Sequence, residues 1–166
     1  MDDQPIKRLF DCPDIAREVG FLMMQSANLE IWLVPVLSKI TDEVTARAII
    51  RKIDNISAKL SILFEIAENR PDDDLARRIA SIRDDVEKAV AYRNSLAHSL
   101  FAFDGDDLHL VRNVVSDRRG KPKFEPLDPS EIRRHAENIS KAISTILGSE
   151  GKSLNLLVPR PPPKRA

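Results

Sequence analysis

The sequence predicts an all-helical bundle of four main helices, with a small β-hairpin inserted before the last helix. Apolar residues recur every three or four positions over four long segments, and most of these segments begin at residues that commonly cap helices. A stretch of alternating apolar residues around a glycine-containing turn is typical of a hairpin. The chain has 166 residues, of which 42% are hydrophobic, so it is long enough for one domain with a hydrophobic core.

The first helix is predicted over residues 14–40, where apolar side chains follow an alternation of three and four. Pro35 lies inside this pattern. Because proline removes a backbone donor and clashes with the preceding turn, we expect a kink or a break between Trp32 and Pro35.

Two further long helices are predicted before the hairpin. The second spans residues 41–68, begins at the capping candidates Thr41 and Asp42, and is stopped by an Asn-Arg-Pro sequence. The third spans residues 72–98 and opens on three aspartates, whose charge suits the positive end of a helix. The apolar spacing of the third helix places Arg93 on its apolar stripe.

The hairpin and the last helix complete the fold. Strands are predicted over residues 100–103 and 108–115, on either side of a turn that contains Gly105. The stretch 116–123 has no apolar residue and is predicted as a basic loop, so regular structure resumes only at the last helix, over residues 128–148. That helix starts with Asp-Pro-Ser-Glu, which combines a cap residue, proline at the first helical position and glutamate at the third.

Three regions follow from this pattern: an N-terminal lead over residues 1–12, a helical domain over 13–148, and a proline-rich, basic tail over 149–166. The tail is expected to be extended and disordered. The alternative is that its Pro-Pro-Pro segment binds a polyproline-reading partner or RNA phosphates.

Composition narrows the function classes. Lysines and arginines number 26 and acidic residues also 26, so nucleic acid would have to be bound by local groups rather than by a general positive charge. The single cysteine, Cys12, favours a reducing compartment. The N-terminal residues lack a signal-peptide pattern, and the longest apolar run is only residues 31–37. We therefore expect a cytoplasmic protein that does not insert into membranes.

The segment Arg93-Asn94-Ser95-Leu96-Ala97-His98 resembles the Arg-Asn-x-x-Ala-His signature of the HEPN family, the higher eukaryotes and prokaryotes nucleotide-binding domains. The order of helices in residues 14–148 is also similar. This resemblance implies a HEPN-like four-helix bundle and a metal-independent endoribonuclease, whose active site forms at a homodimer interface from two copies of this helix end.

The chemistry of these residue types suits RNA cleavage through the 2′-hydroxyl group, which gives a 2′,3′-cyclic phosphate and a 5′-hydroxyl. Such cleavage needs a proton shuttle and a cation that stabilises charge on the phosphate. His98 would be the shuttle and Arg93 the phosphate-binding cation, because arginine presents a planar fork of donors. Asn94 lies four residues before His98 on the same helix face and is expected to orient the imidazole.

Weaker candidates surround this motif. Five basic residues, one in the second predicted strand and four in the loop that follows it, would bind an RNA backbone, although a solvated loop is an equally good interpretation: Arg112, Arg118, Arg119, Lys121 and Lys123. His109 is expected to point away from the core and His135 to lie on the exposed side of the last helix. No glycine-rich phosphate loop, serine elbow or metal-ligand pattern occurs in the sequence, so no metal or cofactor is expected.

Other roles for the motif remain open. Arg93 would then extend its stem over apolar surface or pair with Glu30, and His98 would only satisfy helix carbonyls. The leading function is RNA cleavage in stress response or defence, and the alternative is a non-catalytic HEPN-like dimerisation or scaffold module. A toxin restrained by a regulatory partner is a third possibility. One toxin subgroup carries a modified tyrosine two residues after the histidine, where this chain has Leu100.

Overall fold

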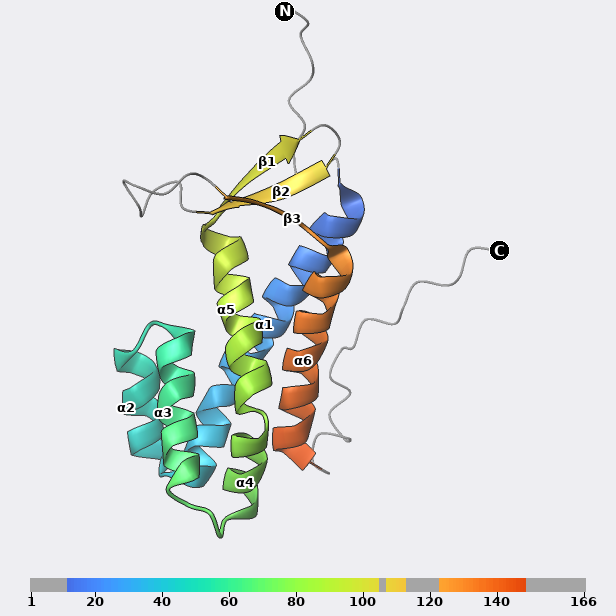
Figure 1. Cartoon of the computed structure of the whole chain (residues 1–166). Coiled ribbons are helices and arrows are strands. Elements are labelled where there is room, and N and C mark those ends of the chain that lie inside the picture. The colour runs from blue at the N-terminus through green and yellow to red at the C-terminus, as the bar shows by residue number, and fades with distance from the viewer. Residues whose placement is uncertain (1–11, 105–106, 113–122, 149–166) are drawn as a thin grey trace, which may run out of the picture.

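Helix α1 (Pro13–Ile40) is the central element of the fold, because four other helices contact it (Figure 1). The computed structural model describes residues 12–104, 107–112 and 123–148. The predicted N-terminal lead, apart from Cys12, and the predicted tail lie outside the described residues. The other elements are α2 (Glu43–Lys52), α3 (Ile56–Glu68), α4 (Asp74–Ser81), α5 (Arg83–His98), β1 (Leu100–Asp104), β2 (Asp107–Arg112), β3 (Lys123–Pro126) and α6 (Pro129–Leu147).

The prediction of a mainly helical chain with a hairpin before the last helix is confirmed, but the number of helices is not. Six helices lie in the described part of the chain, because two predicted helices are each divided. The helix predicted over 41–68 ends at Lys52, where Ile53 takes an extended conformation, and resumes at Ile56. The helix predicted over 72–98 is interrupted at Ile82, so α4 and α5 are separate helices.

Helix α1 continues through Pro35, so the predicted break does not occur. Proline leaves the carbonyl one turn earlier, that of Ile31, without its usual donor. Ile31 is 68% exposed, so its carbonyl lies on the side of the helix that faces solvent, where an unpaired backbone group costs least. The helix therefore tolerates the proline.

The core lies between α1, α5 and α6 and extends over α3 and α4. Its largest fully buried side chains come from all of these helices and from one strand: Leu22, Leu29, Leu33, Leu37, Ile40, Phe64, Leu63, Ile79, Leu96, Leu110, Ile132 and Ile139. By length and composition α1 would also be able to cross a membrane. In this structure, however, its leucines form the centre of the core.

A three-stranded antiparallel sheet, in the order β1-β2-β3, lies at the end of the bundle where α1 and α6 begin and α5 ends (Figure 1). The predicted hairpin is the β1–β2 pair, in which Leu100 is opposite Val111. The third strand corrects the prediction that, after the basic loop, regular structure resumes only at the last helix. Strand β3 pairs with β2 through Val111 and Phe124, and it leads directly into α6, whose predicted cap Asp128 accepts a hydrogen bond from the Ser130 amide at 2.8 Å.

Candidate functional site

Helix α5 carries the motif identified in the sequence at its C-terminal end. The helix is anchored by the buried side chains of Val86, Ala89, Val90 and Leu96. It ends at His98, since Ser99 is extended and β1 begins at the next residue. The end of the helix and the start of the sheet thus fix the position of the motif in the fold.

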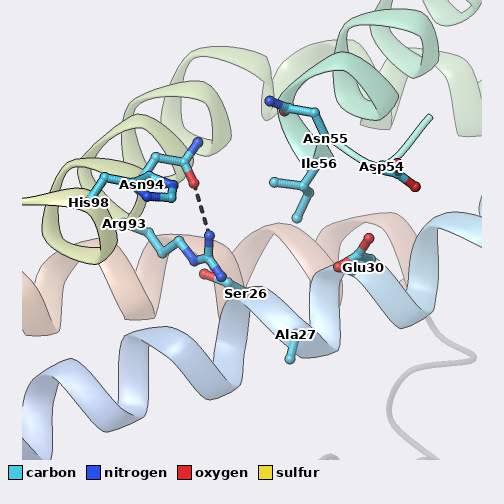
Figure 2. Close-up of a pocket in the computed structure, with 9 residues that line it drawn as sticks. All are labelled: Ser26, Ala27, Glu30, Asp54, Asn55, Ile56, Arg93, Asn94 and His98. Carbon is cyan, nitrogen blue, oxygen red and sulfur yellow. Dashed lines mark hydrogen bonds between the residues drawn. The ribbon is translucent and has the colours of Figure 1, made fainter. Parts of the chain in front are cut away.

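The motif lines a cavity of about 430 Å³ between α1, the start of α3 and the end of α5 (Figure 2). Its walls are formed by Ser26, Ala27, Glu30, Asp54, Asn55, Ile56, Arg93, Asn94 and His98. The three predicted catalytic residues are therefore brought together at one cavity. Its volume is within the range of pockets that hold small molecules.

Arg93 is a partly buried cation with no acidic partner in the part of the chain that the structure describes. Its Nη1 donates to Asn94 Oδ1 at 3.0 Å, while its buried Nε has no hydrogen-bond partner among the described residues. The alternative pairing with Glu30 is not formed, because Glu30 is bound to Lys59 instead. No other described residue forms an ion pair with Arg93. A buried N–H donor without an acceptor costs the folded chain free energy, and an anion bound at Arg93 would supply that acceptor.

Asn94 holds Arg93 rather than His98. Its Oδ1 accepts from the guanidinium and its Nδ2 donates to Ser57 Oγ at 3.3 Å, which connects α5 to the start of α3. His98 is exposed at the edge of the cavity, and no described residue forms a hydrogen bond with its ring. The imidazole is therefore accessible to a molecule bound in the cavity.

The start of α3 forms the wall opposite the motif (Figure 2). Asn55 caps this helix by accepting from the amides of Ser57 at 2.7 Å and Ala58 at 3.4 Å. Sequence analysis missed Asp54, Asn55 and Ile56 as site residues because it placed them inside one long helix. The adjacent Asp and Asn, both common before helix starts, were the available signal.

Helix α1 contributes a second charged group, Glu30. Its Oε1 accepts from Lys59 Nζ at 2.5 Å. Lys59 is only 5% exposed, whereas the Glu30 side chain is 45% exposed. The ammonium is therefore hidden behind the carboxylate, and only the carboxylate faces the cavity. Nearby, the buried Ser26 hydroxyl donates to its own helix at the Leu22 carbonyl, at 2.9 Å.

Of the predicted RNA-binding residues, Arg118, Arg119 and Lys121 lie outside the described residues. For Arg112 and Lys123 the structure describes the backbone, and they are directly paired across β2 and β3. Arg112 is the next residue along β2 after Val111, which pairs with Leu100 at the start of β1. This register places both positions at the end of the sheet nearest His98.

The other two histidines differ in their surroundings. The prediction for His135 is wrong: it is buried, and its ring stacks on Tyr92 with a centroid distance of 4.3 Å. Burial, reinforced by the charge of Arg134 and opposed by that of Glu131, lowers the pKa of His135. In β2, Leu108 and Leu110 are buried, whereas His109 between them is only partly buried. Because successive strand residues point to opposite faces, His109 lies on the other face of the sheet, as the sequence predicts.

No family model matches the chain, and neither the curated proteins nor the solved structures include a match to it. The function is therefore argued from the site. Within the described ranges, no group of three or more His, Cys, Asp or Glu side chains is arranged to hold a metal ion. A cavity with an uncompensated guanidinium and an accessible imidazole is suited to binding a phosphate and transferring a proton at it.

Proposed function

We propose that the protein is a HEPN-like, metal-independent endoribonuclease of the cytoplasm that cleaves RNA as a homodimer, in stress response or defence. The observation that supports this most is the Arg93 guanidinium, which pairs with no acidic group of the described ranges and lines the same cavity as the exposed imidazole of His98. A purely structural arginine would be expected to have its charge paired.

The reaction assigns one role to each residue. His98 accepts the proton of the ribose 2′-hydroxyl, and the 2′-oxygen attacks the adjacent phosphorus. The bond to the 5′-oxygen breaks, and that oxygen takes a proton from the protonated His98 of a second copy, giving a 2′,3′-cyclic phosphate and a 5′-hydroxyl. Arg93 stabilises the charge on the phosphate oxygens, and Asn94 positions the guanidinium through its 3.0 Å hydrogen bond.

A homodimer supplies the two proton-transfer groups that this reaction uses. One copy supplies one imidazole and one guanidinium, whereas the reaction needs both a base and an acid. Two copies related by a two-fold axis supply two of each group. The exposed position of His98 at the end of α5 makes it accessible to a second copy.

The test is cleavage of end-labelled single-stranded RNA by the full chain. We expect His98→Gln to lower the rate about 10²- to 10⁴-fold, the usual contribution of a proton-transfer group. Arg93→Lys keeps the charge but loses the planar fork, and we expect a loss of about 10²-fold or more. Arg77→Lys, in an exposed arginine of α4, is the matched control and should leave the rate unchanged. Unchanged cleavage by His98→Gln would refute the proposal.

One observation favours a second function, that of a non-catalytic dimerisation or scaffold module. Leu100, Val111 and Phe124 form a row across the sheet, and both Leu100 and Phe124 are 58% exposed. Leu96, two residues before His98 in the motif, is buried in the core and is not part of this row. A scaffold predicts that Phe124→Asp abolishes self-association or partner binding, while Arg93→Lys changes neither.

A further inference from the structure

The two ends of the Arg93 cavity differ in charge. Arg93, Asn94 and His98 line one end, on α5 (Figure 2). Glu30 of α1 and Asp54, just before α3, line the other end. A molecule that spans the cavity must therefore present an anion to α5 and hydrogen-bond donors to the two carboxylates, since ionised carboxylates only accept.

The Glu30 carboxylate is held in place by the protein, yet part of it remains available. Lys59 Nζ occupies one position on Oε1, and Oε2 has no partner among the described residues. Because each carboxylate oxygen accepts two hydrogen bonds, both oxygens are able to accept from a ligand. The buried Lys59 fixes the orientation of the group without itself being accessible.

The space between the two charged ends is lined by Ile56 and Ala27. These apolar groups suit the flat face of a nucleobase, which carries no hydrogen-bonding groups. Single-stranded RNA presents its bases unstacked, so that their edges are available to side chains. With a phosphate at Arg93, the nucleobase attached to the same ribose would lie toward Glu30 and Asp54.

The geometry points to a nucleobase subsite that selects guanine, with the Glu30 carboxylate accepting from N1–H and N2–H and Asp54 adding a second acceptor. This inference rests on the proposed function and adds the base preference of the same site. Guanine has two adjacent donors on one edge, which match the two oxygens of a carboxylate. Uracil has a single N–H between two carbonyl oxygens, and these oxygens would repel the carboxylates.

The first measurement is the equilibrium affinity of the full chain for guanosine 3′-monophosphate and for uridine 3′-monophosphate, by calorimetry. A bidentate contact to one base contributes about 5- to 150-fold in discrimination, so we expect guanosine 3′-monophosphate to bind at least about 10-fold more tightly. Equal affinities for the two nucleotides, or no binding of either, would overturn the inference.

Two variants locate the preference. Asp54→Asn changes an exposed residue, preserves the fold and should reduce the guanine preference. Glu30→Gln should abolish it, but it would leave the buried Lys59 ammonium unpaired. Glu30→Gln combined with Lys59→Met removes that ammonium and keeps the test valid. Glu65→Gln, in an exposed carboxylate of α3 away from the cavity, is the matched control. A preference that survives the combined variant would contradict the role of Glu30.

Cleavage of an RNA of mixed sequence separates this inference from the proposed function. Cleavage enriched after guanosine supports both, and cleavage without base preference overturns the subsite while the nuclease proposal stands. Selective binding of guanosine 3′-monophosphate without any cleavage supports the subsite and refutes the nuclease.

Discussion

Replacing Arg93 with methionine distinguishes a functional arginine from a structural one. Methionine is apolar and about as long as the aliphatic stem of arginine, so it fills the volume of that stem. The change removes the unsatisfied Nε–H, whose burial costs about 1–3 kcal/mol. It also removes the hydrogen bond to Asn94, worth about 1.5–3 kcal/mol for a charged donor. Because Asn94 is partly exposed and keeps its bond to Ser57, the second loss lies at the low end.

The two contributions nearly cancel, so the free energy of unfolding of Arg93→Met should stay within about 1 kcal/mol of the parent. At this chain length that corresponds to about 2–4 °C in Tm. An arginine in a buried ion pair would instead cost about 3–5 kcal/mol. Urea unfolding followed by circular dichroism measures the difference, beside RNA cleavage by the same samples. A loss above about 3 kcal/mol at unchanged m-value would show that Arg93 has a structural role and refute this reasoning.

Three further predictions concern stability. Arg133 Nε and Nη2 bind both oxygens of Glu18, which is 3% exposed, at 2.6 and 2.8 Å. Because Glu18 would keep its bond from Arg17 Nε at 3.0 Å, Arg133→Met should cost about 1.5–3 kcal/mol in urea unfolding. Combined with Glu18→Met it should recover most of that loss, and a near-neutral single variant would contradict this. Asn55→Ala removes the α3 cap and should cost about 1 kcal/mol, whereas Asn55→Asp should be close to neutral; equal losses would rule out capping. The pKa of His135 is lowered in the folded state. The contribution of this residue to the free energy of unfolding is therefore complete above about pH 6.5 and is lost as the pH falls through its folded-state pKa. His135→Phe should therefore flatten the dependence of Tm on pH between about 5 and 7, and an unchanged slope would contradict that assignment.

The elements of the fold that were predicted correctly are those marked by a strong local sequence pattern, such as a helix cap or an alternation of apolar residues. Asp128 and the Pro-Ser-Glu that follows it define the start of α6, and the alternation around Gly105 defines the β1–β2 pair. Strand β3 has only one apolar residue with a large side chain, Phe124, within four residues. It forms because β2 offers an unpaired edge, which is a tertiary effect that no local pattern contains.

The candidate site was predicted only in part for a similar reason. Arg93, Asn94 and His98 lie within six residues of one helix, so their motif is visible in the sequence. The opposite wall exists only because α2 ends and α3 begins anew after its cap, Asn55. The apolar spacing of this segment is continuous and favours a single helix, whereas the capping residue favours two, so the sequence pattern did not predict the wall. Glu30 faces the cavity because Lys59 is buried behind it, a contact across 29 residues that spacing does not reveal.

The most direct test of the account is the chemistry of the RNA ends that the protein leaves. Purified parent protein and His98→Gln are incubated with end-labelled single-stranded RNA in excess chelator, and the product ends are identified. We predict cleavage by the parent alone, with 2′,3′-cyclic phosphate and 5′-hydroxyl ends. The absence of cleavage by the parent, equal cleavage by both proteins, or ends bearing a 5′-phosphate would contradict the roles assigned to Arg93 and His98.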